Sequence, residues 1–242
     1  MTNGRSRLIV ALDVPDRSAA LSAVDKLAGR VGYFKIGLEL FISEGPELVR
    51  EIRQRGEGVF LDLKLHDIPN TVAAAVRAAA RLDVQMLTVH AAGGVAMLEA
   101  ARAAAESWTT PPLLLGVTAL TSLSNDDTRR IGVHEAIETW VERLADLAYQ
   151  SRLTGLVASP WELTHLRQKF RGQMKLVVPG IRPSGASSDD QRRFAGPADA
   201  IRAGADFLVV GRPILHAPDP QRAADQITGE IESSDRRPAD KP

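Results

Sequence analysis

The sequence predicts a single (β/α)8 barrel, and three observations lead to this fold class. Short apolar runs alternate with longer amphipathic stretches along the whole chain, which is typical of parallel strands joined by helices. Eight such pairs can be marked out in chain order. The chain has 242 residues, and a closed barrel of this kind typically needs about 250. An open, doubly wound sheet is the alternative, but no Gly-x-Gly-x-x-Gly follows the first apolar run.

The expected strands are nearly continuous runs of valine, isoleucine, leucine and phenylalanine. Such runs are typical of strands that are covered on both faces, as they are when helices surround a barrel. The expected strands span residues 7–13, 33–37, 58–64, 86–90, 113–120, 155–159, 175–181 and 207–211.

The stretches between these runs carry helix signals. Asp16 is a candidate N-cap and Gly29 ends the same stretch. The expected helices span residues 16–29, 46–55, 70–82, 95–106, 134–152, 160–169, 190–203 and 220–231. We therefore expect one barrel domain over residues 1–232, followed by a polar, proline-containing and disordered tail over residues 233–242.

Composition excludes several classes of function. The chain has 30 basic and 30 acidic side chains, which argues against a nucleic-acid partner bound through bulk charge. It has no cysteine, so disulfides, thiolate nucleophiles and cysteine-ligated zinc are excluded. No apolar run approaches the roughly 18–20 residues of a membrane span. We expect a cytoplasmic protein without a membrane or nucleic-acid partner.

Charged residues stand within or at the ends of three expected strands. Asp62 and Lys64 alternate with leucines, so both would point into the barrel mouth, where the chemistry of such barrels is found. Asp13 ends the first strand, Lys35 lies within the second, and Asp67 follows in the loop after the third. A structural ion-pair network would explain any one of them. All of them together favour a functional site, because burying charge costs free energy.

The segment Asp62-Leu-Lys-Leu-His-Asp-Ile-Pro-Asn-Thr71 closely resembles the signature of the orotidine 5'-phosphate decarboxylase family, of the bacterial type. The resemblance runs from about residue 8 to residue 226. Further matching segments are Ala11-Leu12-Asp13, Phe34-Lys35-Ile36-Gly37, Val89-His90-Ala91, Leu120-Thr121-Ser122, Pro179-Gly180-Ile181-Arg182-Pro183 and Val209-Val210-Gly211-Arg212-Pro213. No departure is found at a position that the family uses in catalysis.

The resemblance implies a lyase that decarboxylates orotidine 5'-monophosphate to uridine 5'-monophosphate without a cofactor or a metal. Loss of carbon dioxide from C6 leaves an electron pair in the ring plane, so positive charge must lie nearby. Lys64 would stabilise this carbanion and then protonate it. Asp62 would lie near the substrate carboxylate, and Lys35 and Asp67 would complete the charge array.

The resemblance also implies the residues that bind the substrate. Asp13 and Lys35 would bind the ribose hydroxyls, and Thr121 the pyrimidine. Gly211 and Arg212 would bind the phosphate, because the loops after the seventh and eighth strands often do so in barrels. Arg182 and Gln191 belong to the loop after the seventh strand, which we expect to close over the ligand.

A homodimer is a further implication of the resemblance. Asp67, Ile68 and Thr71 would reach across a two-fold interface into the site of the neighbouring subunit. Spacing and composition alone do not indicate this arrangement.

Two alternatives stay open on the residues alone, one a different enzyme and the other a protein without catalytic activity. One is a metal-dependent sugar-phosphate lyase similar to hexulose-phosphate synthases, which share an Asp-x-Lys-x-x-Asp motif. Those enzymes carry a glutamate near the end of the second strand, where this chain has Lys35, which would repel a divalent ion. The other is a non-catalytic sensor of nucleotide phosphates, which would need Arg212 and Gln191 but not Lys64.

Overall fold

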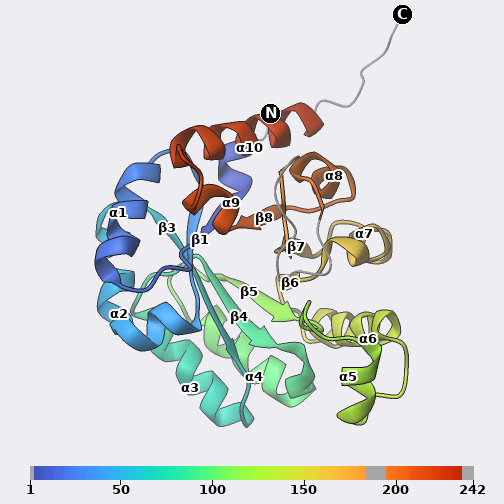
Figure 1. Cartoon of the computed structure of the whole chain (residues 1–242). Helices are drawn as coiled ribbons and strands as arrows, with labels where there is room; N and C mark the ends of the chain where they lie inside the picture. The colour runs from blue at the N-terminus through green and yellow to red at the C-terminus, as the bar shows by residue number, and fades with distance from the viewer. Residues whose placement is uncertain (1–2, 184–194, 236–242) are drawn as a thin grey trace, which may run out of the picture.

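Eight parallel strands close into a barrel in the computed structural model, which describes residues 3–183 and 195–235 (Figure 1). Each strand pairs with the next along the chain, and β8 pairs with β1. The strands are β1 Leu8–Ala11, β2 Tyr33–Ile36, β3 Gly58–Leu65, β4 Met86–His90, β5 Leu113–Val117, β6 Gly155–Val157, β7 Lys175–Val178 and β8 Phe207–Val210. The predicted (β/α)8 barrel is therefore confirmed, and the open sheet is excluded because β1 is hydrogen bonded on both sides.

Helices form the outer layer around the strands (Figure 1). They are α1 Arg17–Leu27, α2 Leu38–Gln54, α3 Pro69–Ala80, α4 Val95–Glu106, α5 Asn125–Arg130, α6 Ile137–Gln150, α7 Leu163–Phe170, α8 Pro197–Arg202, α9 Arg212–Leu215 and α10 Pro220–Asp235. Short 3-10 turns occur at Gly4–Arg7, Ala91–Gly93 and Pro160–Glu162. Among the described residues, no helix is both long and apolar enough to cross a bilayer.

Alternation along the strands separates two layers of the core. In β1, the side chains of Leu8 and Val10 belong to the large cluster between strands and helices. Ile9 and Ala11 belong instead to a smaller cluster inside the barrel, together with Phe60 of β3. The strands are therefore apolar on both faces, as their continuous runs of apolar residues predict. In β3, Asp62 follows Phe60 on the inward face, toward the carboxyl end of the strand.

Three helix boundaries differ clearly from the sequence prediction. The expected helix over 46–55 begins earlier, at Leu38, and is broken at Gly45, whose φ of 68° is left-handed. Pro46 follows this kink and begins the second part of the helix. The expected helix over 190–203 begins only at Pro197, because Ala195 forms a β-bridge with Ile181. Helix α10 continues to Asp235, past the expected domain end at residue 232, and residues 236–242 lie outside the described part.

Two short helices follow strands where no helix was predicted. Helix α5 begins with a capping box, in which the side chains of Ser124 and Asp127 each accept a backbone N–H of the other residue. This Ser-x-x-Asp signal is visible in the sequence. Helix α9 begins directly after Gly211 and has no comparable signal, because it is only one turn long.

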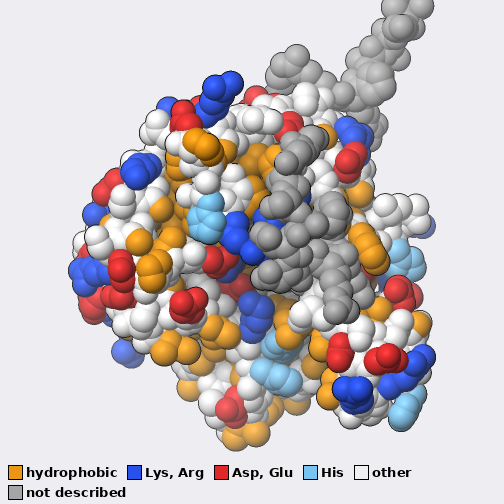
Figure 2. All heavy atoms as spheres, in the orientation of Figure 1, with side chains coloured by type: hydrophobic (Ala, Val, Ile, Leu, Met, Phe, Trp, Pro, Cys, Tyr) orange, Lys and Arg blue, Asp and Glu red, His pale blue; other side chains and the backbone are white. Residues whose placement is uncertain are grey.

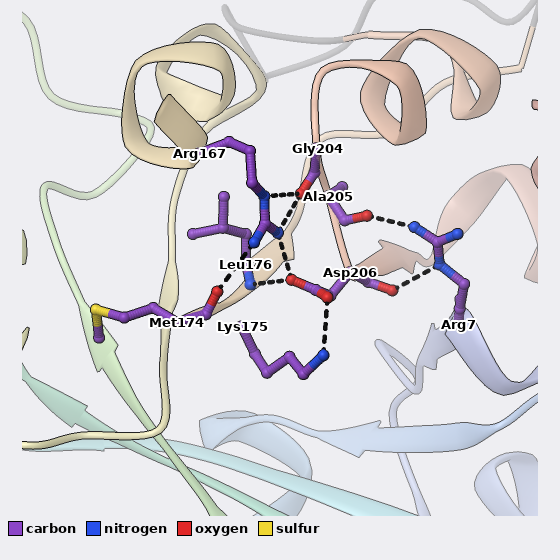
Figure 3. Close-up of polar contacts among 8 residues, drawn as sticks. All are labelled: Arg7, Arg167, Met174, Lys175, Leu176, Gly204, Ala205 and Asp206. Carbon is purple, nitrogen blue, oxygen red and sulfur yellow. Dashed lines mark hydrogen bonds and ion pairs between the residues drawn. The ribbon is translucent and has the colours of Figure 1, made fainter. Parts of the chain in front are cut away.

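The amino-terminal end of the barrel is closed by a hydrogen-bond network around Asp206 (Figure 3). The Asp206 carboxylate accepts hydrogen bonds from the Leu176 N–H at 2.9 Å, Arg167 Nη2 at 2.5 Å and Lys175 Nζ at 3.1 Å. Arg7 donates to the Asp206 carbonyl oxygen at 2.9 Å. Burial alone would raise the pKa of Asp206, but the hydrogen bonds from Leu176, Arg167 and Lys175 outweigh burial and lower it. The network ties the residues that directly precede β1 and β8 to β7 and α7, at the end opposite the mouth.

Candidate active site

A cavity of about 250 Å³ lies at the carboxyl ends of the strands. Most of the site residues that the sequence predicted line it, and they come from strands or strand ends all around the barrel. These lining residues are Asp13, Lys35, Asp62, Lys64, Thr121, Arg182, Gly211 and Arg212. Basic and acidic side chains lie side by side near the middle of the corresponding face (Figure 2). The site is therefore a single cluster of charge at the end of the barrel where such enzymes bind substrates.

Asp62 is the centre of the charge cluster. Its side chain is only 12% exposed and its Oδ2 lies 2.9 Å from Lys64 Nζ and 3.7 Å from Lys35 Nζ. Lys35 also lies 3.5 Å from Asp13 Oδ1, which is nearer the solvent. The order Asp13, Lys35, Asp62, Lys64 thus alternates in sign along the contacts. Alternation keeps each charge beside an opposite one, which lowers the cost of holding them in a partly buried site.

Thr88 is a site residue that the sequence analysis missed. It lies in the middle of β4, is fully buried, and donates its hydroxyl to Asp62 Oδ1 at 3.0 Å. The same hydroxyl oxygen accepts the backbone N–H of Lys64 at 2.8 Å. A signal was present in the sequence, because Thr88 lies two residues before His90 and therefore on the same, inward face of the strand.

Lys64 does not continue a regular strand. Its φ is 49°, in the left-handed region that non-glycine residues seldom adopt. The register between β3 and β4 also shifts between Leu61 and Leu65. Asp62 and Lys64 both line the cavity, as strict alternation predicts. The structure reaches this placement through a local irregularity that sequence periodicity could not indicate.

Gly211 and Gly37 leave room for charged side chains. A Cβ atom on Gly211 would lie 3.1 Å from Asp13 Oδ2, and one on Gly37 would lie 3.2 Å from Lys35 Nζ. Arg212 directly follows Gly211 and lines the cavity together with Arg182. The two arginines therefore flank the side of the cavity formed by the ends of β7 and β8.

The loop after β7 is closed at its base by backbone contacts. Arg182 N–H donates to the Ala195 carbonyl oxygen at 3.0 Å, and Ala195 N–H donates to the Gly180 carbonyl oxygen at 3.3 Å. Arg182 is therefore fixed at the edge of the cavity. The rest of this loop, including the predicted ligand residue Gln191, lies outside the described residues.

Asp67, Ile68 and Thr71 do not line the cavity of their own chain. All are exposed, and Ile68 is 67% exposed although it is apolar. A second hollow, of about 260 Å³, adjoins the charge cluster on the side of α2 and is lined by Lys35, Lys64 and Leu38, among others. The cluster is therefore open on this side as well as toward the main cavity.

His90 lies at the end of β4, and its ring centre is 5.4 Å from that of His66. Burial lowers the pKa of His90, and the nearby His66 and Lys64 lower it further. The lowered pKa favours the neutral form of the ring. Within the described part of the chain, no three or more histidine, aspartate or glutamate side chains are grouped so that they could hold a metal ion.

Comparison with known proteins agrees with this geometry. Residues 6–227 match the model of the family described as "Orotidine 5'-phosphate decarboxylase / HUMPS family". The chain belongs to this family. The orotidine 5'-phosphate decarboxylase of Moorella thermoacetica is 49% identical over 236 residues, which cover 95% of this chain and 94% of that protein. That of Saccharophagus degradans is 48% identical over 225 residues, with 93% and 94% covered.

A solved structure shows the same architecture. The crystal structure of orotidine 5'-phosphate decarboxylase from Lactobacillus acidophilus superposes with a TM-score of 0.84 at 36% identity, and covers 93% of this chain and 98% of that one. Membership of the orotidine 5'-phosphate decarboxylase / HUMPS family, indicated by the motif that begins at Asp62, is therefore confirmed.

Proposed function

We propose that this chain catalyses the decarboxylation of orotidine 5'-monophosphate to uridine 5'-monophosphate, the last step of de novo UMP synthesis. Its family and its relatives named orotidine 5'-phosphate decarboxylase support the assignment. The observation that carries it is the array in which Asp62 lies between Lys35 and Lys64. The cytoplasmic location expected from the sequence stays a prediction.

Lys64 supplies the chemistry in this proposal. Decarboxylation breaks the bond between C6 and the carboxylate carbon and leaves the electron pair on C6, in the plane of the ring. The Lys64 ammonium stabilises this developing negative charge electrostatically. It then transfers a proton to C6 and recovers one from solvent. No cofactor is required, because the electron pair is neutralised by a proton and not delocalised.

Asp62 orients the Lys64 ammonium, and Lys35 contacts the same carboxylate. The Asp62 carboxylate contacts Lys64 at 2.9 Å, within the range of a charge-assisted hydrogen bond. When substrate binds, its carboxylate comes to lie near Asp62, and their repulsion is relieved as carbon dioxide leaves. Lys35 lies on the other side of Asp62, where it limits the negative charge that the substrate meets.

The remaining cavity residues bind the parts of the substrate that do not react. The described charged residues that line the cavity are two aspartates, two lysines and two arginines, so their formal charge is +2. This surplus matches a phosphate dianion, which we assign to Arg212, Gly211 and Arg182. Asp13 with Lys35 binds the ribose, and Thr121 the pyrimidine. Gln191, outside the described residues, is expected at the closed phosphate site.

A second subunit completes the site in this proposal. The exposed Asp67 and Ile68, with Thr71, would enter the hollow beside Lys35 and Lys64 of the partner. The carboxylate of Asp67 would add a further negative charge next to Lys64. The exposed apolar side chain of Ile68 would be buried in the same step, which favours association.

Neither of the two alternative functions fits the charge cluster around Asp62 as well as the decarboxylase does. A metal-dependent sugar-phosphate lyase needs a metal ligand where this chain has Lys35, whose ammonium lies 3.7 Å from Asp62 and opposes a divalent ion. A sensor of nucleotide phosphates would have no use for a Lys64 that is held in a left-handed conformation beside Asp62.

The proposal is tested by following the absorbance of orotidine 5'-monophosphate with the purified protein in excess chelator. Wild-type protein should turn the substrate over at the same rate with and without chelator. The Lys64→Ala variant should lose at least about 10³-fold in kcat, because it lacks the group that stabilises and protonates the carbanion.

The matched control is Lys175→Ala, since Lys175 is also a strand lysine paired with an aspartate, at the other end of the barrel. It should keep wild-type kcat. Absence of turnover by folded wild-type protein would refute the assignment. Turnover that the chelator abolishes would favour the metal-dependent lyase instead.

A further inference from the structure

Thr88 adjoins the charge cluster, and the proposed mechanism assigns it no role. It is completely buried, on the inward face of β4 between Met86 and His90. Its hydroxyl contacts both Asp62 and the backbone of Lys64. Thr88 thus touches, through one oxygen atom, the two residues on which the proposed chemistry depends.

The strand pair is irregular where Thr88 lies. Leu61 pairs with Leu87, and the next pair is Leu65 with Val89. Residues 62–64 of β3 therefore face Thr88 alone, so the two backbones cannot pair residue by residue. The hydroxyl of Thr88 fills this gap, because it accepts the Lys64 N–H at 2.8 Å in place of a backbone carbonyl. Without it, a backbone donor would be left unpaired beside a residue whose φ of 49° is already unfavourable.

The direction of both hydrogen bonds follows from the chemistry of a hydroxyl. Thr88 has one hydroxyl proton, and the Lys64 N–H can only donate, so the oxygen accepts from Lys64 and gives its proton to Asp62. This bond at 3.0 Å fixes Oδ1 of the carboxylate. Oδ2 is thereby turned toward Lys64 Nζ at 2.9 Å and Lys35 Nζ at 3.7 Å.

We propose that Thr88 is a positioning residue for the decarboxylation: its hydroxyl orients the Asp62 carboxylate and holds the strained Lys64 backbone, so that the Lys64 ammonium is aimed at the reacting carbon. The inference rests on the proposed function. This role differs from packing, because valine has nearly the same shape as threonine and would fill the same buried space.

Two pairs of variants test the hydroxyl alone. The first pair is the wild-type protein and Thr88→Val, which keeps the shape of the side chain without the hydroxyl. The second pair is Thr88→Ser and Thr88→Ala, which differ only by that oxygen. In each pair, the member with the hydroxyl should have the higher kcat and kcat/KM, by about 10- to 100-fold, the loss typical of a slightly misplaced catalytic group. The affinity for uridine 5'-monophosphate, measured by calorimetry, should change by less than about 3-fold, because the phosphate and ribose contacts stay intact. The serine variant keeps the test valid if valine prevents folding.

The control is Thr154→Val, which removes a hydroxyl that also bonds across neighbouring strands, to the Leu114 carbonyl oxygen at 3.0 Å at the other end of the barrel. It should leave kcat unchanged. If the wild-type protein is active and kcat is equal within both pairs, the positioning role of Thr88 is overturned while the proposed function stands. A loss of product affinity as large as the loss of kcat would also overturn it, because it would indicate general damage to the pocket. Inactive wild-type protein would instead refute the proposed function.

Discussion

Buried charge and an unfavourable backbone conformation occur at neighbouring residues of the barrel mouth. Lys64 adopts a left-handed backbone conformation and Asp62 is buried between two lysines. Both features cost folding free energy, and they occur together where the proposed reaction takes place. The charges themselves could be predicted from the sequence, because Asp62 and Lys64 alternate with leucines at a strand end. The strain and the role of Thr88 could not, because both arise from the register between β3 and β4, which depends on tertiary pairing.

His90 gives a pH-dependent contribution to stability. Its pKa in the folded protein is lowered, first by burial, so the unfolded chain, with a pKa of about 6.5, binds the proton more readily. The contribution of neutral His90 to folding is therefore complete above about pH 6.5 and is lost as the pH falls below that value. For one proton, the slope of the unfolding free energy cannot exceed about 1.4 kcal/mol per pH unit.

Denaturant unfolding of wild-type protein and the His90→Gln variant between pH 7.5 and about 5 measures this slope. The variant should show a smaller decrease in unfolding free energy over the acidic part of the range. Nuclear magnetic resonance titration should place the pKa of the His90 ring below about 6.5. A ring that titrates at or above that value would contradict the expectation.

At the scale of single elements, most strands could be predicted and several helix boundaries could not. The expected ranges 33–37 and 86–90 differ from β2 Tyr33–Ile36 and β4 Met86–His90 by at most one residue, because a strand covered on both faces is apolar throughout. Helix α2 begins eight residues before the expected 46, because proline is typical of a first helical position and the residues before the Gly45 kink carry no clear helix signal. Ala195 was expected in a helix, but pairing with Ile181 outweighs local propensity.

The Asp206 network should contribute to stability without affecting turnover. Asp206→Asn removes the charge that Arg167 and Lys175 contact, and leaves buried donors imperfectly paired. We expect the unfolding free energy to fall by about 1–3 kcal/mol. That corresponds to roughly 2–4 °C in Tm per kcal/mol for a domain of this size. Calorimetry measures this loss of stability, and the decarboxylase assay should show that kcat stays at the wild-type value.

The pH dependence of this variant follows from the lowered pKa of Asp206. A depressed folded-state pKa gives stability that is complete above the unfolded value of about 3.9 and is lost as the pH falls through the lower, folded value. The variant and wild-type protein should therefore converge in stability below about pH 4. The control is Asp225→Asn, whose pair with Arg30 is more exposed and should cost less than about 1 kcal/mol. Equal losses in the two variants would contradict a special role for the network.

The whole molecule presents an apolar surface beside the active site. Leu38, Ile42, Ile68 and Val95 are exposed by 49%, 79%, 67% and 39%. Each lies at or near the start of a helix that follows one of the adjacent strands β2, β3 and β4, so all of them border the same side of the barrel mouth. Grouped apolar side chains on a surface are typical of an interaction site. This surface therefore supports the predicted homodimer, in which Asp67 would enter the partner's site.

Mixing two inactive variants can test whether Asp67 acts across the interface. In a two-fold dimer of Lys64→Ala with Asp67→Ala chains, one site would have both mutations and the other would have neither. Random reassembly should therefore restore about a quarter of wild-type activity per site, because half of the dimers are mixed and one of their two sites is intact. If Asp67 served its own chain, every site would carry one mutation and no activity would return. A mixture of Lys64→Ala with Asp62→Ala should stay inactive, since Asp62 and Lys64 contact each other within one chain at 2.9 Å. Recovery in the first mixture and not in the second would establish a shared active site, whereas recovery in neither would limit Asp67 to its own subunit.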